Sequence, residues 1–357
     1  MTVKVRIKKR LGAFALDVEF EGGNEVLALL GGSGCGKSMT LRCIAGIVTP
    51  DEGHIEVNGV VYFDSKKRVN MKPQQRRSGL LFQNYALFPN MTTKQNIMTV
   101  FEHGAGGAAA KDERYAEIAR KFYLTGLDDH YPRQLSGGQQ QRAALARIMA
   151  SGPSLIMLDE PLSALDSFLR WKLEIRLSRL LREFSGTTLF VSHNRDEVYR
   201  LCDKVCVINE GRSEQVRCVK EFFERPTTIA SAILSGCKNY SRVEPRADGL
   251  LRALDWGADF RYDGTAPQET RYIGVRAHNF VIEHGHEYGL NIIRGEISEI
   301  HEDLFSAVIN VTPSREGGND VYSVIRAETA KKTAAQFREG ESVSLTAPEH
   351  AVMPLLG

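Results

Sequence analysis

The sequence has no hydrophobic run long enough to cross a membrane. A helical span needs about 20 largely apolar residues, whereas the longest apolar runs here, at 26–30 and 155–158, suit short buried strands. Asp17, Glu19 and Glu21 interrupt the segment after the basic N-terminus, which argues against a secretory signal. We therefore expect a soluble cytoplasmic chain that reaches a membrane only through a partner.

The sequence has few cysteines and a small net charge. Six cysteines in 357 residues are too few for a disulfide framework, and their spacing suits reduced thiols in a core. The 46 basic and 44 acidic side chains leave a formal net charge of +2, so the basic excess of a dedicated nucleic-acid-binding protein is missing. The hydrophobic share of 42% is ordinary, which excludes wholesale disorder, collagen and coiled coil.

The order of the expected elements indicates an α/β domain followed by a β-rich one. Alternation over residues 3–20 predicts a strand with a basic, solvated face, and apolar runs at 26–30, 155–158 and 188–191 predict buried strands. Helices are expected at 37–47, from about 138, and at 166–184. Another helix is predicted by apolar residues at helical spacing, namely Tyr115, Ile118, Ala119, Phe122 and Tyr123. Such alternation of strands and helices predicts a mostly parallel sheet. After about 230, turn signals and short alternating segments predict an all-β module.

A glycine-rich stretch follows the first buried strand and precedes a helix. Residues 31–38 read Gly-Gly-Ser-Gly-Cys-Gly-Lys-Ser and fit the phosphate-binding pattern G-x-x-x-x-G-K-[ST] in the context that this motif requires. Glycines let backbone N–H groups turn toward phosphate oxygens, and the helix N-terminus attracts the anion. Lys37 is expected to bridge the β- and γ-phosphates of a nucleotide, and Ser38 to bind Mg²⁺. The nucleotide-binding residues predicted here are Gly31, Gly32, Ser33, Gly34, Cys35, Gly36, Lys37, Ser38 and Met39.

Two further strands end in polar residues that suit phosphate chemistry. The apolar run at 155–158 leads into Asp159 and Glu160, at the edge where open α/β sheets bind ligands. Asp159 is placed to hold Mg²⁺, and Glu160 to orient or polarise the attacking water. His193 follows the strand at 188–191 and can reach the γ-phosphate edge, although a loop histidine of this kind is usually structural or solvated.

Residues 135–142 read Leu-Ser-Gly-Gly-Gln-Gln-Gln-Arg and resemble the signature motif of ATP-binding-cassette (ABC) ATPases. Ser136 and Gln139 also fit a capping box, S-x-x-Q. That local explanation does not account for Gly137 and Gly138, which are poor helix formers.

Other motifs of this family occur in the family's order. Gln83 resembles the Q-loop glutamine, a ligand of Mg²⁺, and residues 163–166, ending in Asp166, resemble the D-loop. His193 resembles the switch histidine, which with Glu160, Lys37 and Gln83 completes the expected catalytic set. Phe14 stands where the family places an aromatic ring on adenine, with a core position as the alternative. Gly32 departs from the proline that importers often have.

The resemblance implies an α/β P-loop NTPase cassette at 1–230, with a helical subdomain at about 84–150, followed by an all-β, oligonucleotide-fold-like regulatory domain at 231–357. It also implies a head-to-tail homodimer, in which ATP and Mg²⁺ lie between the phosphate loop of one subunit and residues 136–139 of the other. The membrane permease is then a separate chain at whose cytoplasmic face the ATPase sits, and a substrate-binding protein acts indirectly. Candidate residues for docking the permease, unless they pack inside the helical subdomain, are Tyr85, Leu87, Phe88 and Met91.

Two segments narrow the kind of importer. Residues 58–65 resemble a hairpin of molybdate and sulfate importer ATPases, and the tail from about 291 to 357 has the length of one molybdate-binding-type repeat. Residues 273–277 resemble a strand of such tails, although Ala277 and His278 replace its Pro-Glu. We therefore favour molybdate or tungstate uptake, with sulfate next and iron, polyamine or sugar importers as alternatives. The tail either binds an oxyanion or only dimerises.

Two rival functions remain at this stage. One is a soluble ABC ATPase of DNA repair or translation, but repair members usually insert long coiled coils and translation members usually carry two cassettes. The other is a non-catalytic regulatory module, against which the intact Lys37, Glu160 and His193 argue.

Overall fold

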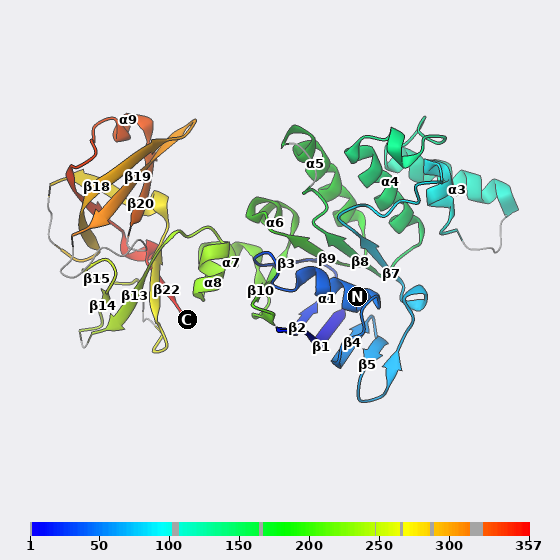
Figure 1. The fold of residues 1–357 in the computed structure, drawn as a ribbon, viewed down its shortest axis with the longest axis horizontal. Coiled ribbons are helices and arrows are strands. Elements are labelled where there is room, and N and C mark those ends of the chain that lie inside the picture. Colours follow the sequence, from blue (N-terminus) through cyan, green and yellow to red (C-terminus); the bar gives the residue numbers. More distant parts are fainter. Residues whose placement is uncertain are drawn as a thin grey trace. The chain divides into compact units, whose positions relative to one another are not determined.

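The chain folds into two compact units, Met1–Val219 and Lys220–Gly357 (Figure 1). The structure is a computed structural model that describes residues 2–101, 107–163, 167–246, 248–264, 267–285, 289–314 and 324–357. Helix α7 (Val219–Glu224) begins at the boundary between the units, and α8 (Ile229–Leu234) belongs to the second unit. No helix in these ranges is long and apolar enough to cross a membrane.

One half of the large sheet in the first unit is mainly antiparallel. Residues 3–20, expected to form one strand, instead form a hairpin, because Gly12 (φ 60°) turns the chain between two strands that pair Leu11 with Phe14. The alternation itself is confirmed, since the valines and isoleucine of the first strand are buried and its basic residues are exposed, apart from the half-buried Lys9. Asn58 and Gly59, both with positive φ, form the next tight turn, as expected for a two-residue hairpin. The strands here are β1 (Val3–Leu11), β2 (Phe14–Gly22), β4 (Glu52–Val57), β5 (Val60–Asp64) and β6 (Val69–Asn70).

The other half of this sheet is parallel and confirms the three predicted buried strands. Its neighbours in order are β7 (Ser78–Leu81), β8 (Leu155–Asp159), β9 (Thr187–Ser192), β3 (Val26–Leu30) and β10 (Lys204–Asn209). Two short strands, β11 (Arg212–Ser213) and β12 (Arg217–Cys218), pair with β10. Register pairs Leu30 with Ser192 and Asp159 with Val191. The carboxyl ends of β3, β8 and β9 therefore meet at one edge of the sheet.

Four helices of the first unit confirm those expected from the sequence, namely α1 (Lys37–Ala45), α3 (Gly107–Lys121), α4 (Gly137–Ala150) and α5 (Ser167–Glu183). The described part of this unit also contains α2 (Thr93–Met98) and α6 (Arg195–Leu201). Of the apolar stripe expected near α3, Tyr115, Ala119 and Phe122 are buried. The expectation for Tyr123 is wrong: its side chain is 59% exposed, because the helix has ended and the residue turns with φ 54°.

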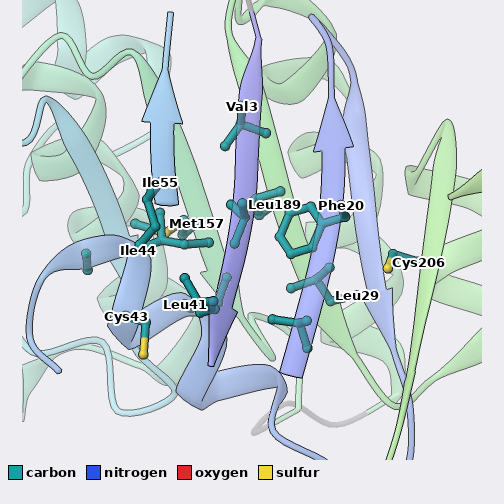
Figure 2. Close-up of a cluster of buried hydrophobic side chains, with 14 of the residues drawn as sticks. Val3, Phe20, Leu29, Leu41, Cys43, Ile44, Ile55, Met157, Leu189 and Cys206 are labelled. Atoms are coloured by element: carbon teal, nitrogen blue, oxygen red, sulfur yellow. The ribbon is translucent and has the colours of Figure 1, made fainter. Parts of the chain in front are cut away.

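In the core of the first unit, the helix that follows the glycine-rich loop packs against both halves of the sheet. Leu41 and Ile44 of α1 pack with Met157 and Leu189 of the parallel strands and with Ile55 of the antiparallel half (Figure 2). Of the six cysteines, all free, five are buried, in line with the expected reduced thiols. This packing holds α1 against the sheet.

The second unit contains two five-stranded antiparallel sheets over a common core, which confirms an all-β tail. One sheet runs β15 (Ala258–Phe260), β14 (Leu251–Ala253), β13 (Asn239–Pro245), β16 (Tyr272–Val275) and β22 (Met353–Leu355). The other runs β17 (Val281–His284), β21 (Ser342–Thr346), β18 (Ile292–Glu302), β19 (Ser306–Pro313) and β20 (Ile325–Ala330), with α9 (Lys331–Ala334) after it. The segment from 291 onward shares its sheets with earlier strands, because β17 pairs with β21 and β22 pairs with β16.

Candidate active site

The glycine-rich loop connects β3 to α1 in a backbone path that side chains would obstruct. Gly36 caps α1 with φ 107°, and a Cβ there would lie 2.4 Å from Leu16 Cδ1. A Cβ on Gly31 would lie 2.1 Å from the carbonyl oxygen of Ile208. At these two positions the loop requires glycine for steric reasons. The predicted loop is therefore built where the motif places it.

Lys37 directs its charge into this loop. The residue is only 5% exposed, and its Nζ donates to the carbonyl oxygens of Gly31 (2.9 Å) and Gly32 (2.7 Å). The same Nζ lies 3.7 Å from Cys35 Sγ. An ammonium group held by loop carbonyls beside a helix N-terminus is a suitable partner for phosphate oxygens.

The remaining predicted loop residues differ in exposure. Gly32, Ser33 and Gly34 are exposed. Phe14 and Met39 are half-buried and pack against the core. The ring of Phe14 lies beside the loop, since its Cζ is 3.2 Å from the place of a Cβ on Gly36.

Ser38 and Asp159 join the start of α1 to the end of β8. Ser38 Oγ donates a 2.8 Å hydrogen bond to Asp159 Oδ1. Burial raises the pKa of Asp159 above its ordinary value, while the hydrogen bond from Ser38 acts in the opposite direction. No cluster of three or more His, Cys, Asp or Glu side chains suited to a metal occurs among the described residues. A hydroxyl beside a single carboxylate nonetheless fits Mg²⁺, which usually binds through one or two carboxylates, waters and substrate phosphates.

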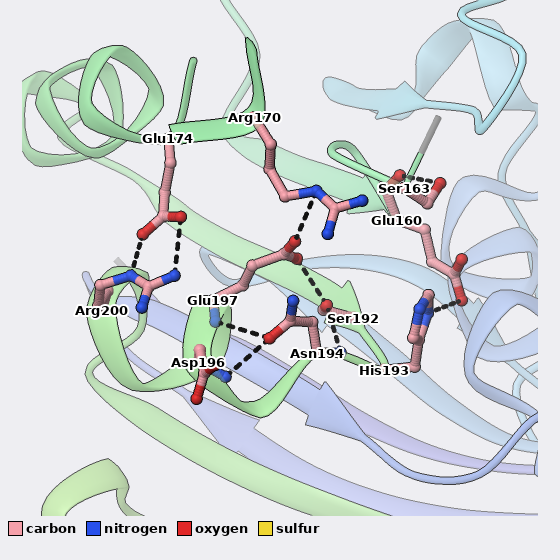
Figure 3. Close-up of polar contacts among 10 residues, drawn as sticks. All are labelled: Glu160, Ser163, Arg170, Glu174, Ser192, His193, Asn194, Asp196, Glu197 and Arg200. Carbon is pink, nitrogen blue, oxygen red and sulfur yellow. Dashed lines mark hydrogen bonds and ion pairs between the residues drawn. The ribbon is translucent and has the colours of Figure 1, made fainter. Parts of the chain in front are cut away.

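Glu160 and His193 meet at the ends of neighbouring strands. His193 Nδ1 lies 3.2 Å from Glu160 Oε1 (Figure 3). Glu160 has φ 48°, a conformation that costs energy outside glycine. Three hydrogen bonds hold its backbone there. Its N–H donates to the carbonyl of Val191 (3.0 Å), and its carbonyl accepts from Ser163 Oγ (2.9 Å) and from the Ser163 N–H (3.2 Å). The pair can therefore orient a water molecule and exchange its proton.

A buried polar network lies behind His193 and was not predicted. Ser192 Oγ donates to Glu197 Oε2 (2.7 Å) and accepts from the N–H of Asn194 (2.9 Å). Asn194 caps α6, and Arg170 of α5 lies 4.0 Å from Glu197 (Figure 3). Burial raises the pKa of Glu197, with the bond from Ser192 opposing it. The network anchors the strand end that carries the histidine.

Arg76, which the sequence pattern did not single out, helps to position α1. It is 2% exposed, and its guanidinium donates to the carbonyls of Cys43 and Ile44 at the end of α1 and to that of Met71. The carbonyl of Cys43 also accepts from the N–H of Gly46, so Arg76 adds to the hydrogen bonds that close the end of the helix. Its only sequence signal is a basic residue in a polar stretch, which also describes its exposed neighbour Arg77.

The signature stretch forms the predicted helix start but stands apart from the loop. Ser136 Oγ accepts from the N–H of Gln139 (3.4 Å) and Gln139 Oε1 accepts from that of Ser136 (2.7 Å), which confirms the capping box. Gly137 and Gly138 open α4. Among the described residues, no hydrogen bond or ion pair connects these four residues to the glycine-rich loop.

The other predicted positions are distributed as follows. Gln83 is exposed on the segment after β7, whereas Tyr85, a candidate for docking, is buried. Phe88 is 48% and Met91 is 36% exposed. Asp166 lies outside the described residues.

Comparisons with known proteins agree with this geometry. The family described as ABC transporter matches residues 16–163. The chain is 36% identical over 262 residues to the spermidine/putrescine import ATP-binding protein PotA of Thermobifida fusca, covering 73% of this chain and 66% of that protein. It is 39% identical over 255 residues to the sulfate/thiosulfate import ATP-binding protein CysA of Thermosynechococcus vestitus, covering 70% and 74%.

A solved structure extends the match to the fold. The ATP-binding cassette MJ0796, in a dimeric post-hydrolysis state bound to ADP and Pi, superposes with a TM-score of 0.52 at 27% identity. The superposition covers 61% of this chain and 99% of that one. With a glycine-rich loop, two carboxylates and a strand-end histidine at one sheet edge, the chain belongs to the ABC transporter family.

Proposed function

We propose that this protein is the ATP-hydrolysing subunit of an ABC importer. The observation that carries the proposal is the convergence of three strand ends, which brings the phosphate loop, the Ser38–Asp159 pair and the Glu160–His193 pair to one edge. In-line phosphoryl transfer to water needs mainly such positioning and charge stabilisation.

Each residue at this edge has a proposed role. Lys37 bridges the β- and γ-phosphates, and Glu160 orients the attacking water and accepts its proton. His193 contacts the γ-phosphate edge and holds Glu160 in place. Ser38, Asp159 and Gln83 would hold Mg²⁺, which when bound neutralises charge on the β- and γ-phosphates.

We also propose that a second copy completes the site. The capped N-terminus of α4, at residues 136–139, is exposed at Ser136 and Gly137 and has no partner within the loop of its own chain. Helix N-termini bind anions, so these residues, with Asp166, suit the triphosphate held by the other subunit. The dimeric state of the MJ0796 cassette supports this arrangement. Phe14, beside Gly36, is placed for adenine.

A membrane permease is the second proposed partner. Phe88 and Met91, which follow Gln83 in the sequence, have exposed apolar side chains, and the guanidinium of Arg147 lies 5.1 Å from the ring of Phe88. Similarity to import ATP-binding proteins supports docking of a permease helix here. The ATPase would then be peripheral, at the cytoplasmic face, and a substrate-binding protein would act through the permease.

The proposed cargo is a tetrahedral oxyanion. The 58–65 hairpin and the all-β tail favour molybdate or tungstate, and the similarity to a sulfate/thiosulfate import protein supports the same chemical class. The tail, at 231–357, would act as a regulatory domain that binds this oxyanion. A polyamine is the second candidate, because another relative is a spermidine/putrescine import protein.

Uptake by the reconstituted transporter tests the proposal. We expect ATP-dependent uptake of labelled molybdate, tungstate or sulfate, and its loss in Lys37→Ala together with weaker ATP binding. Uptake of labelled spermidine alone would reject the oxyanion while keeping the ATPase. Unchanged ATP affinity in Lys37→Ala would reject the phosphate site itself.

A further inference from the structure

A cavity of about 360 Å³ lies between α3, α4 and α5, among residues that have no part in the proposed nucleotide site. The segment just after α3 contributes Phe122 and Tyr123, and α4 contributes Gln141 and Arg142. Helix α5 contributes residues between Leu173 and Glu183. Its volume is within the range of small-molecule sites, roughly 300–1,000 Å³.

The lining combines an apolar floor with a cationic rim. Phe122, Leu173 and Leu177 are at most 4% exposed and form part of the floor. The charged lining residues are Arg120, Lys121, Arg142, Arg176, Arg179 and a single carboxylate, Glu183. Among the residues described, Glu183 forms its ion pair with Lys121 (2.7 Å) and not with any of the four lining arginines.

The arginines at this rim act on one another unfavourably. Burial lowers the pKa of Arg142, and the charge of Arg176 lowers it further. Within the described part of the chain, no carboxylate forms an ion pair with Arg142, Arg176 or Arg179. The guanidinium of Arg176 lies 4.6 Å from the ring of Tyr123, which is 59% exposed at the cavity. An anion is the group that would relieve this repulsion.

Two polar groups at the cavity also lack partners. Gln141 is 1% exposed, and its Oε1 has no hydrogen bond. Arg142 Nε is likewise buried without an acceptor. Buried polar groups in native structures are nearly always paired. Both groups lie on α4, one turn from its capped start, and both line this cavity.

We propose that this cavity is a binding site for a small amphipathic organic anion. Its apolar or aromatic body would lie against the floor formed by Phe122, Leu173 and Leu177. Its acidic group, a sulfonate, phosphate or carboxylate, would accept hydrogen bonds from Arg142, Arg176 and Arg179. Inorganic anions lack the body, and neutral aromatics lack the charge, so neither uses both parts of the lining.

Fluorescence titration of the full-length protein with 8-anilinonaphthalene-1-sulfonate tests this. The dye combines an aromatic body with one sulfonate, and an excess of ADP keeps it from the nucleotide site. Because Arg176→Gln/Arg179→Gln removes two of the charged donors that would bind the sulfonate, it should weaken dye binding by roughly tenfold or more. Neutral N-phenyl-1-naphthylamine should bind more weakly and should not distinguish this variant from the parent.

The matched control is Arg182→Gln, which removes the same charge from the exposed side of α5, outside the cavity. It should leave the dye affinity within about twofold of the parent, since exposed charges at a distance are screened. Thermal unfolding of each variant verifies that it is folded. Equal dye affinity in the parent and the double variant, or an equal loss in Arg182→Gln, would overturn the proposal.

Discussion

The two units of this chain are specified in different ways. In Met1–Val219, short contiguous motifs at strand ends carry the proposed chemistry, and glycines such as Gly31 and Gly36 are required by contacts that a Cβ would violate. In Lys220–Gly357, alternating strands bury a common apolar core, and no comparable motif stands out. The difference teaches that the proposed active site depends on the positions of a few individual atoms. The fold of the β-rich tail depends instead on a pattern of buried and exposed residues spread over many strands.

The largest contrast between the units is expected from removing one carboxylate in each. Glu160→Gln should lower the rate of ATP hydrolysis by about 10²–10⁴-fold, the usual contribution of a positioned acid or base, while ATP binding persists. Phosphate release at saturating ATP and a binding titration measure the two effects. The control is Glu341→Gln in the tail, which pairs with His284 at 2.9 Å and should not alter hydrolysis. Near-normal turnover in Glu160→Gln would remove this residue from catalysis.

Truncating a core side chain in the tail should lower stability and leave ATP hydrolysis unchanged. Phe260 is fully buried, so Phe260→Ala should destabilise the second unit by about 3–5 kcal/mol. Hydrolysis by the first unit should continue at the parental rate. Phe305→Ala, at a residue that is 87% exposed, is the control and should change stability little. Thermal unfolding followed with an activity assay measures both. Parallel loss of activity and tail structure would show that the units are not independent.

A smaller effect separates two glycines of the same loop. Gly36→Ala places a methyl 2.4 Å from Leu16 Cδ1 at φ 107°, and should cost about 1–3 kcal/mol of loop stability, with weaker ATP binding. Gly32→Ala meets nothing within 4 Å and should bind ATP nearly as the parent does. Calorimetric titration with ATP compares the pair. Equal affinities would show that the loop tolerates rearrangement at Gly36.

The smallest expected effect concerns the buried charge of Asp159. Because burial raises the pKa of Asp159 in the folded protein, its ionised form disfavours folding at pH values above the ordinary pKa of 3.8. Without nucleotide, Asp159→Asn should therefore be more stable than the parent at pH 7, and the gain should disappear near pH 3, where both states are protonated. Urea denaturation at both pH values measures it, with the exposed Asp263→Asn as control. A gain that persists at pH 3 would contradict the electrostatic explanation.

The fold was predictable where the pattern is local. The runs at 26–30, 155–158 and 188–191 became the buried strands β3, β8 and β9, and the S-x-x-Q pattern became the capping box of Ser136 and Gln139. The failures have local causes too. Gly12 turned one expected strand into a hairpin, and Tyr123 left the core because its helix ended two residues earlier.

The parts of the site that were not predictable depend on distant residues. Arg76 holds the end of α1 through backbone carbonyls, which leave no trace in residue types. The partners around Glu197 come from α5, β9 and α6, and their meeting depends on how those elements pack (Figure 3). The cationic cavity could not be predicted from the sequence either. Its arginines come from three separate helices, and the amphipathic pattern of each helix indicates only that one of its faces is solvated.

The sequence alone determined that a phosphate-binding loop precedes a helix and that acidic residues end a buried strand, because backbone freedom and hydrophobic runs are properties of neighbouring residues. Only the tertiary structure decided that Ser38 and Asp159, 121 residues apart, share a hydrogen bond and that His193 faces Glu160. Strand order and register within the parallel sheet set those distances. Both depend on the packing of the whole core, which no single segment of the sequence specifies.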